Sequence, residues 1–263
     1  MPLDLDAYLQ RIEYTGGRIP SLAMLQSMHF AHATHVPFEN VDVFLRRPIR
    51  LDLESLQAKL VRGRRGGYCF EQNLLFAAAL EQLGFRATLL QARVRLGANR
   101  MLPRTHALLA VDIAGVRWLA DLGFGSFGLL EPIPLAVGEF RQFAWSYRLL
   151  RESDLWVLQA LIAGNWQDLY AFTLEPQFPV DFEPANHYVS THPDSRFVQT
   201  LTVQRVEPEM RYVLKNFELV VSTPSGDTRR TLDSSPELIE LLATQFGLYF
   251  PTDTQFLPAT PLV

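Results

Sequence analysis

The chain has 263 residues, of which 48% are hydrophobic and 20% charged, a balance typical of a globular protein with a sizeable core. Its net charge of -4 argues against general nucleic-acid binding, and its single cysteine excludes an internal disulfide. The first residues lack the basic and apolar regions of a signal peptide, and every apolar run is too short to cross a bilayer. We therefore expect a cytoplasmic protein without nucleic-acid or membrane partners, and formation of a homo-oligomer is left open.

The first third of the chain is predicted to be helical. Asp4, Ser21 and Asp52 are each placed to cap a helix whose apolar residues recur at helical spacing. A further helix is expected to open near Cys69 and to stop at Gly84.

The helical period is lost after Gly84, and short segments typical of strands follow. We predict strands over 86–95, 105–112, 116–120, 142–150, 155–161, 166–172, 197–205 and 212–222. Short strands at close intervals favour an antiparallel barrel or sandwich. Several prolines predict a long ordered loop over 175–193, and a last helix is expected from Ser234 to Gly247.

The only cysteine lies in the stretch Arg65-Gly66-Gly67-Tyr68-Cys69-Phe70-Glu71-Gln72-Asn73. A helix that opens at Cys69 would direct free backbone N–H groups and the positive end of its dipole toward the sulfur, which favours the reactive thiolate. A lone cysteine can also be a small buried hydrophobe. Position alone leaves both interpretations open.

A histidine and an aspartate that could assist Cys69 occur on a predicted hairpin. His106 begins the strand 105–112, and Asp121 follows the strand 116–120, with the turn at Ala114-Gly115 between them. This pairing would make the two residues near-opposite neighbours, so that the carboxylate could orient the imidazole. A buried histidine and a turn-forming aspartate fit the pattern equally well.

Other motifs carry weaker signals. His29, His32 and His35 recur at three-residue intervals, but without a nearby acidic ligand pair they indicate helix packing or surface positions more than a metal site. His187 and His192 need no special role. The segment 123–128 fits G-x-G-x-x-G, yet two prolines follow it, so we expect a turn whose amides line a pocket. The basic run 62–65 could attract an anionic cofactor or form a solvated loop.

Taken together, these segments closely resemble the arylamine N-acetyltransferase family. The signature R-G-G-x-C-x-E-x-N is matched by Arg65, Gly66, Gly67, Cys69, Glu71 and Asn73. Further blocks similar to the family, in the same order, are Val36-Pro37-Phe38-Glu39-Asn40 with Asp42, Arg47-Pro48-Ile49, Thr105-His106 and Asp121-Leu122-Gly123-Phe124-Gly125. The resemblance is strong over the first half of the chain and weaker beyond it.

The resemblance implies an α+β fold with a papain-like or transglutaminase-like Cys-His-Asp core. Its expected parts are an N-terminal helical bundle (1–85) that carries the cysteine, a central antiparallel β-barrel (86–190) that carries His106 and Asp121, and a C-terminal α/β lid (191–263). The implied activity is transfer of an acetyl group from acetyl-CoA to arylamines and arylhydrazines, or to the oxygen of N-hydroxyarylamines. The reaction would be ping-pong, through an acetyl-cysteine and without a metal.

The resemblance also implies roles for individual residues. Cys69, His106 and Asp121 would form the catalytic triad, and the Cys69 N–H would be an oxyanion donor. Phe38, Val94 and Phe124 would line the acceptor pocket, where aromatic amines suit phenylalanine rings. Thr105, Gly125, Ser126, Phe127 and Gly128 would contact CoA. Arg65, Glu39 and Asn73 would support the reacting groups without reacting.

Two alternatives share parts of this pattern. A triad alone does not choose the acyl donor, so a papain-like or transglutaminase-like hydrolase or amide transferase is the first alternative. A packed structural module without catalysis is the second. The signature around Cys69 and the glycine turn after Asp121 favour the acetyltransferase over both.

Overall fold

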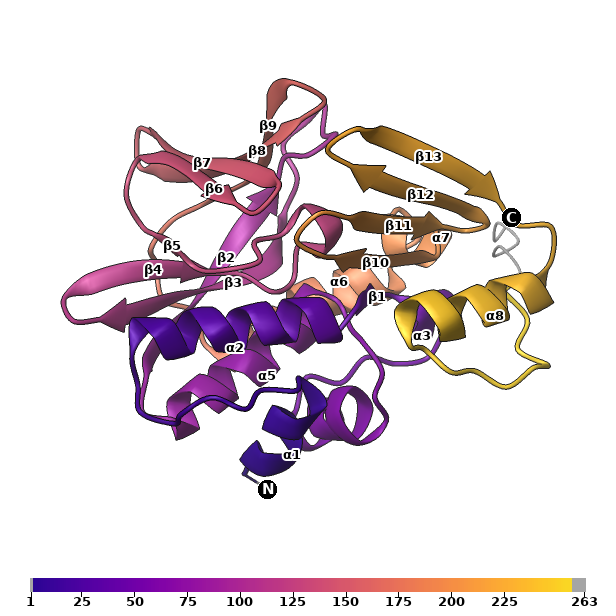
Figure 1. Cartoon of the computed structure of the whole chain (residues 1–263), viewed down its shortest axis with the longest axis horizontal. Helices are drawn as coiled ribbons and strands as arrows, with labels where there is room; N and C mark the ends of the chain where they lie inside the picture. The colour runs from indigo at the N-terminus through magenta and orange to yellow at the C-terminus, as the bar shows by residue number, and fades with distance from the viewer. Residues whose placement is uncertain (1, 257–263) are drawn as a thin grey trace.

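The computed structural model describes residues 2–256, in which a layer of helices supports two antiparallel sheets (Figure 1). Its helices are α1 (Leu5–Arg11), α2 (Leu22–His35), α3 (Val41–Phe44), α4 (Leu53–Leu56), α5 (Cys69–Gln82), α6 (Phe182–Thr191), α7 (Arg196–Gln199) and α8 (Ser235–Phe246). A π-helical segment, Gln57–Arg62, continues α4, and 3-10 turns span Gly125–Phe127 and Pro179–Asp181. Within these residues, none of the helices combines the length and the apolar character needed to cross a lipid bilayer.

The predicted helix starts are confirmed. The side chains of Asp4, Ser21 and Asp52 each accept a hydrogen bond from a backbone N–H three residues on, which satisfies one of the free donors at the helix end. Helix α5 begins at Cys69, and the Glu71 carboxylate accepts the Tyr68 N–H at 3.1 Å. This local capping fixes the position at which the cysteine enters the helix.

The central sheet has eight strands and curves into a nearly closed antiparallel barrel. Their order is β5-β4-β3-β2-β9-β8-β7-β6, and every neighbouring pair is antiparallel. The strands are β2 (Arg86–Val94), β3 (Arg104–Ile113), β4 (Val116–Ala120), β5 (Ile133–Pro134), β6 (Gly138–Gln142), β7 (Trp145–Glu152), β8 (Leu155–Ile162) and β9 (Asn165–Phe172). Helix α5 packs on β2 and β3, and one apolar core runs through the helices and the barrel. The predicted α+β class is confirmed.

A second sheet pairs residues 38–39 with a segment far along the chain, residues 202–231. It has the order β1-β10-β11-β12-β13, and its members are β1 (Phe38–Glu39), β10 (Thr202–Val206), β11 (Arg211–Lys215), β12 (Glu218–Thr223) and β13 (Gly226–Thr231). Phe38 pairs with Gln204 across β1 and β10. Helix α8 packs its leucines into a separate core under this sheet, together with Val41 and Phe44. The division into three domains stays a prediction. Strand β1 belongs to the predicted helical domain but pairs with β10 of the predicted lid.

Three predicted segments were wrong in type. The expected loop 175–193 contains α6, which buries Phe182, Asn186 and Val189 at helical spacing. Its Pro184 lies in the first turn, where the missing N–H breaks no helical bond. The expected strand 197–205 begins with α7, which Ser195 caps, and 212–222 is a hairpin rather than one strand.

The turn after β4 lies directly against the first turn of α5. A Cβ atom on Gly123 would be 2.4 Å from the Cys69 Cα atom and 2.6 Å from its Cβ atom. Real carbon atoms do not approach so closely, so only glycine lets the turn that follows Asp121 reach the cysteine.

We therefore expect Gly123→Ala to lower the free energy of unfolding by about 1–3 kcal/mol, the usual cost of overpacking. Urea unfolding would measure the loss of stability, and a changed rate of Cys69 alkylation would show that the turn has been displaced. Gly17→Ala is the matched control, because a Cβ there meets no atom within 4 Å. Unchanged stability and unchanged alkylation in Gly123→Ala would contradict the packing constraint.

Candidate active site

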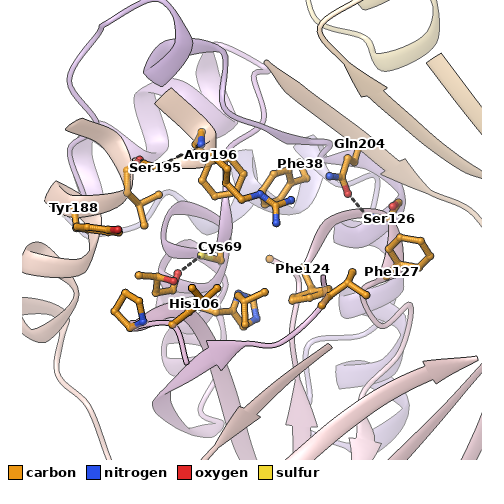
Figure 2. A pocket seen from close by; sticks show the side chains of 18 of the residues that line it. Phe38, Cys69, His106, Phe124, Ser126, Phe127, Tyr188, Ser195, Arg196 and Gln204 are labelled. Carbon is orange, nitrogen blue, oxygen red and sulfur yellow. Dashed lines mark hydrogen bonds between the residues drawn. The ribbon is translucent and has the colours of Figure 1, made fainter. Parts of the chain in front are cut away.

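Cys69 is buried at the first position of α5, with 4% of its surface exposed. Its Sγ atom lies 3.6 Å from the Thr105 carbonyl oxygen, at the start of β3, and borders a cavity (Figure 2). The free N–H groups of the first helical turn and the positive end of the dipole stabilise negative charge at this position.

His106 and Asp121 form a buried pair beside the cysteine. His106 Nε2 lies 2.7 Å from Asp121 Oδ2, and both side chains are almost completely buried. Because Nε2 is engaged by the carboxylate, Nδ1 is the ring nitrogen left for Cys69. The two residues were predicted to be near-opposite neighbours; Leu109 pairs with Ala120, so His106 and Asp121 are diagonal neighbours across the hairpin. The pair forms nonetheless, because the imidazole is long enough to span the offset.

The electrostatics of the pair favour opposite charges on its members. Burial lowers the pKa of His106, but the nearby Asp121 carboxylate and the Cys69 sulfur outweigh it and raise the pKa to about 10. Burial likewise raises the pKa of Asp121, but His106 and hydrogen bonds from the Gly123 N–H and Asn73 bring it below its ordinary value. The pair therefore places a positively charged ring beside the Cys69 sulfur at neutral pH.

Asn73 ties this pair to α5. Its Nδ2 donates to the Ala107 carbonyl at 2.7 Å and to Asp121 Oδ1 at 3.1 Å, and its Oδ1 accepts the Leu122 N–H. The Gly123 N–H donates to Asp121 Oδ1 at 2.8 Å. Asn73 is therefore hydrogen-bonded to both sides of the β3–β4 hairpin, which holds the carboxylate in a single orientation.

His29 holds the backbone of Asp121 from the opposite side. Its Nε2 accepts the Asp121 N–H at 3.1 Å, and its Nδ1 lies 3.0 Å from the Leu130 carbonyl oxygen. Burial lowers the pKa of His29 to about 4, so the ring is neutral and can donate at one nitrogen while it accepts at the other. The other two histidines of α2 bond elsewhere, His32 to the Tyr8 hydroxyl and His35 to the Ala31 carbonyl. In residues 2–256, no three His, Cys, Asp or Glu side chains are grouped to hold a metal ion.

A cluster of buried charges underlies the start of α5. Lys59 Nζ lies 2.7 Å from Glu71 and 3.0 Å from Asp42, while Arg65 lies 2.6 Å from Glu39 and 3.3 Å from Asp42. Burial disfavours charge on Lys59, but the surrounding carboxylates raise its pKa above the ordinary value. Arg65 is therefore not part of a solvated loop, and Arg62 in the same run pairs with Glu54. The cluster joins β1, α3 and α5 rather than binding an anion.

The double glycine of the signature, Gly66-Gly67, lies where the segment before α5 contacts β1. A Cβ on Gly66 would lie 2.1 Å from the Pro37 carbonyl oxygen, and Gly67 forms an isolated bridge with Phe38. The segment before Cys69 therefore lies flat against the segment that carries Phe38.

A cavity of about 240 Å³ opens in front of Cys69 (Figure 2). The three residues predicted to bind the acceptor, Phe38, Val94 and Phe124, all line it, as do Cys69, His106, Thr105, Ser126 and Phe127. The other two residues predicted to bind CoA, Gly125 and Gly128, instead border a smaller hollow next to Asp121. The structure thus brings together the predicted cavity-lining side chains but not these two glycines. Their roles in binding stay predictions.

Several residues near the reacting groups were not predicted. Phe197 and Tyr188 line the cavity from α7 and α6, the two helices that the sequence interpretation missed. The Tyr170 ring packs on His106, with ring centroids 4.8 Å apart, and also contacts Phe124. Helical spacing of buried residues over 182–189 was the available signal for α6. No sequence pattern indicated that Tyr170 would lie on the imidazole.

The site thus groups a cysteine at the start of helix α5 with His106 on β3 and Asp121 directly after β4. A family model described as N-acetyltransferase matches residues 21–254. An arylamine N-acetyltransferase of Mycolicibacterium smegmatis is 40% identical over 255 residues, covering 94% of this chain and 93% of the relative.

Two solved structures share the fold. The arylamine N-acetyltransferase of Nocardia farcinica superposes with a TM-score of 0.90 at 44% identity, covering 95% of this chain and 90% of that one. The Mycobacterium marinum enzyme in complex with CoA gives a TM-score of 0.88 at 35% identity, covering 93% of each chain. The chain therefore belongs to the arylamine N-acetyltransferase family of enzymes.

The charged state of His106 should make stability depend on pH. The pKa of His106 is raised from 6.5 to about 10 in the folded state. Its contribution to the free energy of unfolding is therefore complete below pH 6.5 and is lost as the pH rises toward 10. We expect the free energy of unfolding of the wild type to exceed that of His106→Gln most near pH 6, and less at each higher pH. Urea titrations from pH 6 to 10 would measure this difference. Exposed His187→Gln is the control, and a difference for His106→Gln that does not change with pH would exclude a charged, paired ring.

Loss of the His29 ring nitrogens should weaken the support of Asp121. His29→Phe leaves the buried Asp121 N–H and Leu130 carbonyl without these partners, so we expect the free energy of unfolding to fall by about 1–3 kcal/mol. Urea unfolding and the rate of Cys69 alkylation would both be measured, with exposed His187→Phe as control. Wild-type values for both in His29→Phe would show that Asp121 is held without His29.

Proposed function

We propose that this enzyme transfers the acetyl group of acetyl-CoA to the nitrogen of arylamines and arylhydrazines, or to the oxygen of N-hydroxyarylamines, through an acetylated Cys69. The observation that carries the proposal is the buried His106–Asp121 pair next to a cysteine at the first position of a helix, at a cavity with phenylalanine walls. Membership of the arylamine N-acetyltransferase family supports the choice of acyl donor and acceptor.

In the first half-reaction the Cys69 thiolate attacks the thioester carbonyl of acetyl-CoA. A bond forms between Sγ and the acetyl carbon, and the bond from that carbon to the CoA sulfur breaks. The His106 imidazolium gives its proton to the departing CoA sulfur, and Asp121 keeps the ring oriented. The Cys69 N–H, at the N-terminus of α5, would donate a hydrogen bond to the developing oxyanion. Exchange of one thioester for another keeps the acetyl group activated.

In the second half-reaction the amine occupies the space that CoA has left. Its nitrogen attacks the acetyl carbon, the bond to Sγ breaks, and neutral His106 takes the proton that the amine loses. The thiolate–imidazolium pair is then restored. The rings of Phe38 and Phe124 would hold the aromatic part of the acceptor by stacking or edge contacts. Val94 would fill the remaining apolar wall.

The residues around the cavity also suit acetyl-CoA. Thr105, Ser126 and Phe127 border the cavity, and the buried Ser126 hydroxyl has no hydrogen-bond partner within residues 2–256. Such a group could bond the amide-rich pantetheine arm. The CoA complex of the M. marinum relative supports a CoA site in this fold.

Mass spectrometry would test the proposal directly. Incubation with acetyl-CoA should leave one acetyl group on the peptide that contains Cys69, and addition of an arylamine should remove it and yield the acetylated amine. Cys69→Ala should give no adduct and no turnover while it keeps a wild-type circular dichroism spectrum.

His106→Ala should lose the rapid reaction of Cys69 with iodoacetamide at neutral pH. The transferase proposal fails if no adduct forms and no CoA is released with an arylamine present. An adduct that water removes as fast with the amine as without it would indicate a hydrolase instead.

A further inference from the structure

The cavity in front of Cys69 contains a cation that the acetyl-transfer mechanism does not use. Arg196, the first residue of α7, lines this cavity, and its side chain points into it on the side of Phe38 (Figure 2). The carbon of its guanidinium lies 5.4 Å from the centroid of the Phe197 ring. Arg196 as a residue is exposed, yet desolvation at its charged end lowers its pKa.

This guanidinium lacks the ion pairs and hydrogen bonds that Arg65 and Arg11 make. Arg65 pairs with two carboxylates, and Arg11 donates to four backbone carbonyls. Across residues 2–256, by contrast, no carboxylate oxygen lies within 4 Å of an Arg196 nitrogen, and its side chain donates no hydrogen bond. Asp194 shares the cavity wall but does not pair with it.

The other charges on the wall do not neutralise Arg196. Besides Asp194 and His106, the charged residues that line the cavity are Arg100 and Lys215, both positive. A partly desolvated cation without a counter-charge, in a cavity with an excess of positive charge, is suited to bind an anion.

We propose that Arg196 binds a carboxylate on the aromatic acceptor, so that the enzyme prefers arylamines whose ring carries an anionic group. The inference rests on the proposed acetyl transfer and specifies its acceptor. A planar guanidinium matches a carboxylate with two parallel hydrogen bonds. The Phe197 ring lies next to the guanidinium and contacts the Phe38 ring, so an acceptor ring held against these aromatic side chains could direct its amine to Cys69 and its carboxylate to α7.

A phosphate of acetyl-CoA is the other source of negative charge. In CoA the phosphates are separated from the sulfur by the whole pantetheine arm. Arg196 instead shares with Cys69 one cavity of about 240 Å³, which suits a single substituted ring. The compact anion of an acceptor therefore fits this position better.

The test compares 4-aminobenzoate with its neutral amide, 4-aminobenzamide, as acceptors for the full-length enzyme. We expect Arg196→Gln to lower the ratio of kcat/KM for the acid to kcat/KM for the amide by about 10- to 100-fold, through KM, because a charge-assisted hydrogen bond is lost. Arg196→Lys should keep part of this preference, because the positive charge remains but the planar group that makes two parallel hydrogen bonds is lost. Exposed Arg50→Gln removes the same charge outside the cavity and should leave the ratio unchanged.

A second measurement separates the two sources of the anion. The rate at which acetyl-CoA acetylates Cys69 without any amine should be the same in wild type and Arg196→Gln. A slower acetylation with an unchanged acceptor ratio would assign Arg196 to a phosphate and overturn the proposal. Equal loss for the acid and the amide would show that the side chain only packs, and would also overturn it. Failure of the wild type to form any acetyl-cysteine would refute the acetyl transfer itself.

Discussion

The contact between the turn after β4 and the first turn of α5 determines the rest of the site. Gly123 touches the backbone of Cys69, and this contact sets how far the barrel lies from the helical layer. At that distance Asn73 can bridge α5 to Asp121, and His106 can sit beside the sulfur. The three groups come from two structural layers, so their geometry follows from one close contact between the layers. Asn73 donates a hydrogen bond to the carboxylate, and His29 accepts one from the Asp121 N–H, so that Asp121 is fixed within that geometry.

The buried charges below α5 play a different part. Each carboxylate in this cluster has a cationic partner within 3.5 Å, which offsets the cost of removing it from water. Because Glu39 lies on β1 and Glu71 on α5, the ion pairs set the position of Phe38 relative to Cys69. The cluster thereby shapes the front wall of the cavity without entering the chemistry. The residues of the signature thus divide into Cys69, the proposed nucleophile, and several residues that fix its position.

Much of this arrangement could be predicted from the sequence, for identifiable reasons. Helix caps and glycine turns are local signals, so the helix starts and the hairpin that carries His106 were predicted correctly. The diagonal offset between His106 and Asp121 shows the limit of such signals: a loop fixes which strands pair more firmly than which residues face each other. Helices α6 and α7 were missed because prolines are frequent in and around these segments. Their apolar faces are explained only by packing against the rest of the fold, which the local sequence does not show. Tyr170, His29 and Arg196 approach the site through packing between distant segments, which no spacing along the chain records.

The pairing of β1 with β10 has a consequence for how the molecule is made. Phe38 lies in the first sixth of the sequence, yet its strand partner, Gln204, belongs to the last quarter. Closure of such a long loop is entropically costly and belongs to late stages of folding. A growing chain therefore carries Cys69, His106 and Asp121 before it has the strand and helix that complete the cavity. Substrate recognition is acquired only after the chain has been synthesised beyond β10.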